Sequence, residues 1–158
     1  DVDNNKYLVR KLPDNKKAAN LLANIRLKLV KLCDYLELKH SDNKAVYRLV
    51  KRFNSNNITE STPNEQYTSY SVNKGEKVVF CLRSRDERQK LVDENVMMFV
   101  ALHELAHIMT KSIGHTDEFW DNFRYLLKHA IKIGVYKDVD FEKKPVDYCG
   151  TKITNSPL

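Results

Sequence analysis

The most constraining feature of this sequence is an apolar segment interrupted by ionisable side chains. Residues 96–109 read VMMFVALHELAHIM, in which His103, Glu104 and His107 stand among apolar residues. A helix that is hydrophobic on nearly all sides is buried in its protein. Two imidazoles and a carboxylate are costly to bury unless they find partners. The chain must therefore fold around this helix and satisfy these three side chains inside it.

The spacing of the polar residues predicts a metal site. His103 and His107 lie four positions apart, so on a helix they project roughly 40° from each other and can reach one ion. Glu104 points roughly 100° round from His103 and can face a water rather than the metal. HExxH gives zinc two ligands and a carboxylate base, whereas core histidines bonded to the backbone or to Glu104 need no such spacing. The metzincin extension HExxHxxGxxH fails, because Thr110 and Ile113 stand at its glycine and third-histidine positions.

The third ligand decides what kind of site this is. A catalytic zinc site has three protein ligands and leaves the fourth position for water. His115 follows Gly114, where we expect the helix to end and the chain to turn back towards the metal. Glu118 is the main alternative, with Asp117 behind it, although both acidic residues also suit the first turn of the next helix. A surface position for His115 is the remaining alternative.

Hydrophobic periodicity and turn residues divide the rest of the chain into short elements. We expect helices at about 14–38, after Asp42, at about 94–113 after Asp93, and from Thr116 to Gly134. We expect strands at 66–72 and 77–83, joined by a turn at Asn73-Lys74-Gly75. We expect a polar loop at 54–65, a charged connection at 84–90, and a tail without periodicity from residue 135. In the last helix, Phe119, Trp120 and Phe123 are expected to be core residues rather than a substrate pocket.

The composition is that of one folded unit with a basic surface. The chain has 158 residues, 42% of them hydrophobic, which suggests a single domain over residues 1–158. No run of 18 apolar residues is present, so we expect no membrane span. The net charge of +6 permits contact with nucleic acid, and a solvated lysine-rich surface explains it equally well. Lys outnumbers Arg by 19 to 8, which argues against sequence-specific reading of DNA.

The cysteines suggest a reducing environment. Cys33, Cys81 and Cys149 are far apart and odd in number, so they do not resemble a disulfide framework. We therefore expect an intracellular, reducing compartment. The chain begins at Asp1 rather than Met, so the sequence leaves open an upstream targeting or membrane segment.

From His103 to Trp120 the sequence resembles the WLM metalloprotease domain, which is related to the spartan-type and SprT-like proteases. In that family HExxH is followed by a short loop with glycine, a third histidine, an acidic residue and an aromatic pair. The matching positions here are His103, Glu104, His107, Gly114, His115, Asp117, Phe119 and Trp120. YLVRKLP near the start and CGTKITNSPL at the end are similar to WLM-like proteins of large DNA viruses. For a viral protein, the expected reducing compartment is the host cytoplasm, the nucleus or the virion.

The resemblance implies an α+β, zincin-like fold, with a small twisted sheet packed on the HExxH active-site helix and with flanking helices. It implies three histidine ligands to Zn²⁺, namely His103, His107 and His115, and so favours His115 over Glu118. Glu104 is then the catalytic base. The implied activity is that of a zinc-dependent endopeptidase.

The expected mechanism uses a zinc-activated water. Zinc lowers the pKa of its water, Glu104 takes the proton, and the water attacks a peptide carbonyl before Glu104 passes the proton to the leaving amine. Tyr148 is a candidate oxyanion donor, although it can equally be an ordinary tail residue. Asp117 is expected to orient a ligand histidine through a hydrogen bond, a role that its position in a first helix turn explains almost as well. An extended substrate is expected to pair with an edge strand at 77–83.

The expected partner is a protein substrate, and the expected state is a monomer. Cellular members of the family cleave proteins crosslinked to DNA, so non-specific DNA contact and such a crosslinked substrate are further expectations. This chain has no separate DNA-binding module, extra zinc finger or long basic tail, and a viral member could instead process virion or host proteins. The alternative function is a non-catalytic, zinc-stabilised protein- or DNA-binding module. Glu104 argues against it, because a structural site has no use for a base.

Overall fold

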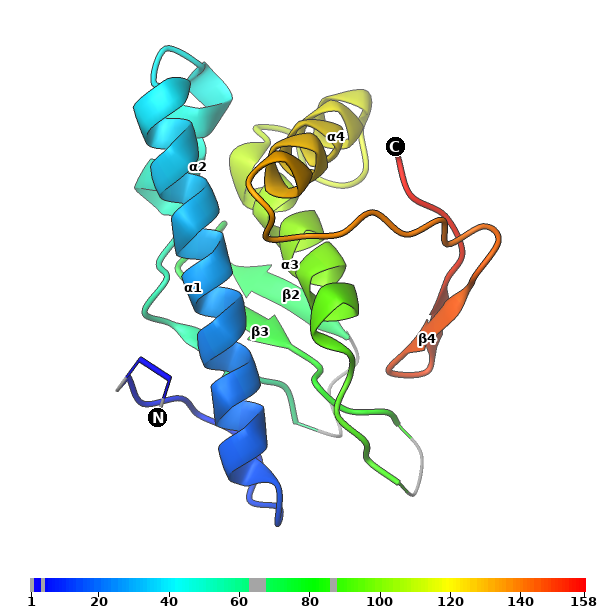
Figure 1. Cartoon of the computed structure of the whole chain (residues 1–158). Helices are drawn as coiled ribbons and strands as arrows, with labels where there is room; N and C mark the ends of the chain where they lie inside the picture. The colour runs from blue at the N-terminus through cyan, green and yellow to red at the C-terminus, as the bar shows by residue number, and fades with distance from the viewer. Residues whose placement is uncertain (1, 4, 63–67, 86–87) are drawn as a thin grey trace.

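The computed structural model describes residues 2–3, 5–62, 68–85 and 88–158. Its elements are, in chain order, α1 (Asn15–Lys39), α2 (Lys44–Arg52), β1 (Ile58–Glu60), β2 (Ser69–Val72), β3 (Lys77–Phe80), α3 (Glu94–Met109), α4 (Asp117–Lys132), β4 (Val146–Tyr148) and β5 (Thr151–Ile153). The long helix α1 flanks the molecule, and a small sheet lies beside α3 (Figure 1). This is the α+β architecture expected from the sequence.

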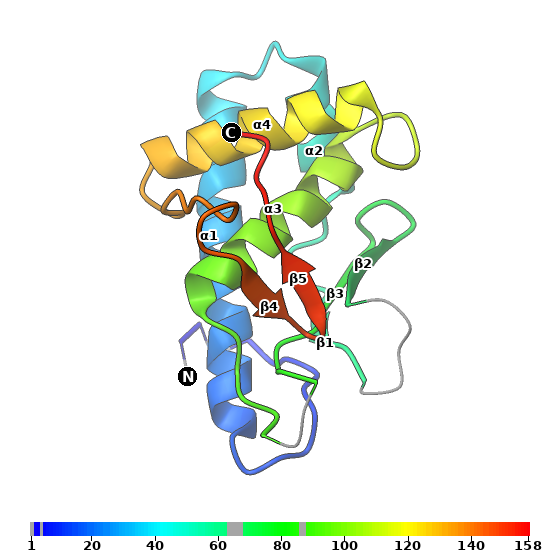
Figure 2. The same ribbon diagram turned by 90° about the vertical axis from the view of Figure 1, so that its right-hand side faces the viewer.

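Helix α3 lies at the centre of the fold. It has α1 on one side and the C-terminal hairpin of β4 and β5 on the other, and α4 crosses near its end (Figures 1 and 2). Its residues Met97, Met98, Ala101, Leu102 and Leu105 are fully buried. The burial follows from its composition, because a helix that is apolar on nearly every face gains from contact on every face.

The sheet has the strand order β1-β3-β2, with β1 parallel and β2 antiparallel to β3. Two expectations were wrong here. The expected loop at 54–65 contains β1, which is only three residues long and carries too little pattern to stand out. The strand expected at 77–83 is not an edge strand, because β3 pairs on both sides. The backbone N–H of Glu60 in β1 donates to the Leu8 carbonyl at 3.0 Å, so the N-terminal segment covers that side and β2 forms the other edge.

Helix ends match the expected capping chemistry in part. The side chain of Asp93 accepts from the N–H of Val96 at the start of α3, as expected. The cap of α2 is Asn43 rather than Asp42. Asp14 is the N-cap residue of α1, but its side chain makes no capping hydrogen bond and instead pairs with the guanidinium of Arg83.

The C-terminal tail is more ordered than its sequence suggested. Strands β4 and β5 pair as a hairpin whose turn is formed by Cys149 and Gly150, both with positive φ. Cys149 is bonded to Cys81, just after β3. The expectation that the cysteines do not pair was therefore wrong, and the inference of a reducing compartment loses its support. The two cysteines lie 68 positions apart in sequence, and only the tertiary fold brings their Cα atoms to 6.4 Å.

Within the described part of the chain, no helix is both long enough and apolar enough to cross a membrane.

Candidate metal centre

Three imidazoles converge at the end of α3. His103 and His107 project from adjacent turns of the helix, and His115 reaches them from the loop that follows. One ring nitrogen from each histidine lies within 4.8 Å of the others. The Nε2 atoms of His103 and His115 are 3.2 Å apart. The structure thus brings together the three residues expected to bind zinc.

The turn that returns His115 differs from the expected one. Helix α3 ends at Met109, with Thr110 as its C-cap, rather than at Gly114. The Thr110 hydroxyl donates to the Ala106 carbonyl at 2.6 Å, which competes with continuation of the helix. Gly114 has a φ of +86° and directly precedes His115. It therefore shapes the returning loop rather than ending the helix.

Burial favours the metal-binding, neutral form of two of these histidines, His107 and His115. Burial, reinforced by the charge of His103, lowers the pKa of His107 from 6.5 to about 4. Burial and the charge of His103 also lower the pKa of His115. A metal ligand must be a neutral imidazole, and three such nitrogens suit zinc. The donor set therefore fits a zinc ion.

Glu104 contacts both the sheet and the histidine cluster. Its side chain is buried, with 4% of the residue exposed. The hydroxyl of Ser69, at the start of β2, donates to its Oε2 atom at 2.9 Å. The same oxygen lies 3.2 Å from Nδ1 of His103. A carboxylate in this position can exchange a proton beside the histidines without being one of the three converging ligands.

Aromatic rings of α4 form the wall behind the imidazoles. Phe119 stacks on His107, with ring centroids 4.2 Å apart and planes 27° apart. Trp120 lies 5.7 Å from His115, and Phe123 lies 5.4 Å from His103. Phe119 and Phe123 are core residues as expected, and they also restrict how the rings can turn.

The loop that carries His115 is held by charged side chains. Glu118 accepts hydrogen bonds from the backbone N–H of Lys111 at 3.0 Å and of Ser112 at 3.1 Å. Lys74, from the turn between β2 and β3, donates to the carbonyls of His107, Thr110 and Ser112 at 2.8–3.2 Å. Both oxygens of Glu118 are thus committed to the loop, whereas His115 converges with the other two imidazoles.

Two other candidates, Asp117 and Tyr148, lie in positions with different roles, and a further histidine, His129, lies in a separate cluster. Asp117 is exposed, and within the described residues no hydrogen bond or ion pair joins it to a histidine. His129 lies against His40, with ring centroids 4.7 Å apart, in an aromatic cluster with Tyr35 and Tyr125. Tyr148 is buried, and its hydroxyl donates to the carbonyl of Cys81 at 2.7 Å. That hydroxyl is engaged with the backbone rather than poised as an oxyanion donor.

Comparison with known proteins bears on this site. Residues 36–157 match the sequence model of the WLM domain. The chain is 36% identical over 162 residues to uncharacterized protein R325 of Acanthamoeba polyphaga mimivirus, with 100% of this chain and 82% of that protein covered. It is 26% identical over 157 residues to uncharacterized protein 136R of Invertebrate iridescent virus 6, with 94% of this chain and 84% of that protein covered.

Solved structures show the same fold. Wss1 from Saccharomyces cerevisiae superposes with a TM-score of 0.62 at 22% identity, over 82% of this chain and 90% of that chain. A Wss1 mutant from S. pombe superposes with a TM-score of 0.54 at 20% identity, over 79% and 95% of the two chains. The expected zincin-like fold is confirmed by this likeness. Because the domain match spans most of the chain, the protein belongs to the WLM family, which relates it to metalloproteases.

Proposed function

We propose that the protein is a zinc-dependent endopeptidase that hydrolyses peptide bonds in protein substrates. The observation that carries the proposal is the convergence of His103, His107 and His115 beside a buried glutamate that is not one of the three. A zinc site that only stabilises a fold is normally closed by four protein ligands. Three histidines with a neighbouring carboxylate base are the arrangement of a hydrolytic site.

The chain's own residues supply positioning and proton transfer. A zinc ion at the three histidines would supply Lewis acidity, which makes a water molecule more acidic and a peptide carbonyl more reactive. Glu104 would accept the proton from the attacking water and return it to the leaving amine. Ser69 holds one oxygen of Glu104 and so fixes the direction from which the proton is taken.

The proposed substrate is an extended segment of a protein. Because β3 is the central strand, such a segment would pair with the edge strand β2, whose first residue Ser69 contacts Glu104. This replaces the expectation that residues 77–83 form the docking edge.

The basic face of α2, in which Lys44, Tyr47 and Lys51 line a hollow of about 770 Å³, supports non-specific contact with DNA as a further proposal. We also propose that residues 1–158 form one domain and act as a monomer.

The experiment that tests the proposal is Glu104→Gln in the zinc-loaded protein. We expect zinc content to stay at the wild-type level, while cleavage of an unstructured protein falls by roughly 100-fold or more, because a general base is removed. Glu94→Gln, at the solvent-accessible start of the same helix, is the matched control and should cleave normally. Cleavage by Glu104→Gln at the wild-type rate would exclude this mechanism. Zinc binding by the wild-type protein without cleavage of any peptide in a library would favour the binding-module alternative.

A further inference from the structure

The disulfide joins two segments that meet near Glu104. Cys81 directly follows β3, and Cys149 is the first residue of the two-residue turn between β4 and β5. A two-stranded hairpin is only marginally stable by itself. The Cys81–Cys149 bond therefore fixes the tip of the hairpin against the end of the central strand, on the side of α3 opposite α1 (Figure 2).

Tyr148, the residue before Cys149, connects the disulfide to Glu104, the candidate base. The hydroxyl of Tyr148 donates to the Cys81 carbonyl at 2.7 Å and lies 3.5 Å from the Thr68 carbonyl. The next residue, Ser69, donates to Glu104. Burial raises the pKa of the Tyr148 hydroxyl, and the negative charge of Glu104 adds to this rise, which places the phenol within the field of that carboxylate. The start of β2 is thus held between the hairpin and α3.

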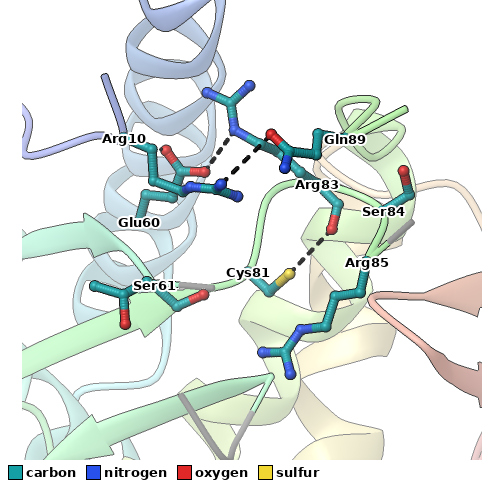
Figure 3. Close-up of a pocket in the computed structure, with 9 residues that line it drawn as sticks. Arg10, Glu60, Ser61, Cys81, Arg83, Ser84, Arg85 and Gln89 are labelled. Atoms are coloured by element: carbon teal, nitrogen blue, oxygen red, sulfur yellow. Dashed lines mark hydrogen bonds and ion pairs between the residues drawn. The ribbon is translucent and has the colours of Figure 1, made fainter. Parts of the chain in front are cut away.

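The two bonded cysteines border hollows through which a small molecule can approach. Cys81 lines a cavity of about 210 Å³, where its sulfur faces the Arg83 carbonyl (Figure 3). Cys149 lines a separate hollow of about 510 Å³. The cysteines themselves are only 5% and 3% exposed. A small thiol can therefore reach this wall of the fold, while attack on sulfur requires local opening of the hairpin.

The remaining cysteine differs in all these respects. Cys33 lies in α1 and is free and buried. Burial raises the pKa of its thiol to about 12, so it holds almost no reactive thiolate at neutral pH. Among the three cysteines, thiol–disulfide exchange is therefore expected at Cys81 and Cys149 rather than at Cys33.

We propose that Cys81 and Cys149 form a thiol-oxidation site that sets the position of Tyr148 and Ser69, and through them of Glu104. In the disulfide form the hairpin is docked and the base is held. Two thiol molecules of the glutathione class convert the bond to two cysteine thiols and are themselves oxidised to one disulfide, so that two electrons and two protons pass to the protein. The reduced hairpin then leaves the start of β2, and Ser69 no longer holds the carboxylate in one direction.

The functional part of this inference rests on the proposed peptidase activity, but its structural part does not. Misplacing a catalytic group by about 1 Å can reduce a rate by roughly 100-fold. We therefore expect kcat to fall by up to roughly 100-fold on reduction, while KM and zinc content change little. Tyr148→Phe keeps the ring but loses the hydroxyl, and it should lower kcat even with the disulfide intact.

The experiment compares zinc-loaded wild type, Cys149→Ser and the matched control Cys33→Ser in oxidised and reduced glutathione. Thiols are counted by mass spectrometry, the kcat and KM for an unstructured protein are measured, and the rate of limited proteolysis within residues 138–153 is followed. We expect wild type and Cys33→Ser to lose activity and to gain cleavage in this segment on reduction. Cys149→Ser should behave like reduced wild type in both buffers. Because this variant has no Cys81–Cys149 bond to reduce, a difference between the two buffers would report removal of zinc by the thiol.

The outcomes separate the two proposals. Equal kcat and equal tail proteolysis in oxidised and fully reduced wild type would overturn the redox inference. If the wild type cleaves no substrate in either state, the proposed function fails. In that case, proteolysis of residues 138–153 still decides whether the Cys81–Cys149 bond holds the β4–β5 hairpin in place. If Cys149→Ser does not fold, reduced wild type replaces it as the sample without the disulfide.

Discussion

At the scale of single residues, the convergence of the three imidazoles depends on Glu118, a side chain that would not itself bind the metal. Glu118 bonds the backbone of the loop that carries His115, while His115 itself joins the other two rings. We predict that His115→Ala removes tight zinc binding, because only two protein ligands remain. Glu118→Ala should bind zinc roughly 10- to 100-fold more weakly, as is typical when the partner that positions a ligand is lost.

Zinc content after dialysis and competition with a chelator would measure this difference. Asp117→Ala is the matched control, since Asp117 is an exposed neighbour in the same helix turn, and it should bind zinc like the wild type. Full zinc content in His115→Ala would show that another residue completes the site.

The lowered pKa of His107 also predicts a pH dependence for the metal-free protein. Its pKa is about 4 in the folded chain and near 6.5 when unfolded, so between these values only the unfolded chain takes up the proton. Above pH 6.5, His107 should not make the free energy of unfolding depend on pH. Below pH 6.5, the free energy of unfolding should fall as the pH drops towards 4, by at most about 1.4 kcal/mol per pH unit. Urea unfolding of chelator-treated protein at several pH values tests this. His107→Gln should lose that part of the slope, and an identical slope in both proteins would contradict the explanation.

Three of the site residues that sequence analysis identified share one property, which is that a helix fixes their relation. His103, Glu104 and His107 lie within five positions, so helix geometry alone brings them together. Ser69 and Lys74 reach the same site from strand β2 and the turn between β2 and β3, more than 30 positions away in sequence. No local pattern marks such residues, because their partners are set by the packing of β2 against α3.

At the scale of elements, the turn between β2 and β3 depends on a glycine. Gly75 has a φ of +114°, and a Cβ atom there would lie 2.6 Å from the Arg52 carbonyl oxygen and 3.1 Å from Cγ2 of Ile108. We predict that Gly75→Ala lowers the free energy of unfolding by roughly 3 kcal/mol, since backbone strain and a steric clash add up. Gly134 also has a positive φ, of +80°, but a Cβ atom added there would have no atom within 4 Å. Gly134→Ala should cost roughly 1 kcal/mol.

Urea unfolding of the two variants would measure these costs. Equal destabilisation would show that α2 yields to the new methyl group. The same turn carries Lys74 to the end of α3, so Gly75→Ala should also weaken zinc binding, whereas Gly134→Ala should not.

The limits of sequence analysis at this scale have physical causes. The four helices were predicted because their apolar periodicity extends over two turns or more. Strand β1 was missed because three residues carry almost no alternation, and its identity as a strand depends on pairing with β3. The end of α3 was misplaced by several residues, because Thr110 bonds its own helix while Gly114 serves the loop. The Cys81–Cys149 bond was missed because sequence separation says nothing of distance in the fold.

At the scale of the whole molecule, the disulfide closes a loop that contains the entire metal centre. A loop of this length, with a sequence separation of 68, corresponds to roughly 4 kcal/mol of stabilisation through the lost entropy of the unfolded chain. This is a substantial part of the roughly 5–15 kcal/mol that stabilises a typical domain. The oxidation state of Cys81 and Cys149 therefore bears on survival of the fold as well as on the position of the hairpin.

Helix α1 ties the N-terminal part of the chain to the same core. The WLM match begins at residue 36, near the end of this helix. Leu22, Ile25, Leu29 and Leu32 are nevertheless fully buried in the common core. Burying each such side chain contributes roughly 1.5–3 kcal/mol, so these four residues together contribute as much as the net stability of many domains.

We therefore predict that a fragment of residues 36–158 does not fold, even though it contains the matched domain and all three histidines. Far-ultraviolet circular dichroism and urea titration should show no cooperative transition, and zinc should not restore one. A fragment of residues 6–158 is the matched control, because it keeps α1 and the segment that pairs with β1. It should unfold cooperatively. Cooperative unfolding of the 36–158 fragment would mean that α1 is an appendage and that the folding unit is smaller than residues 1–158.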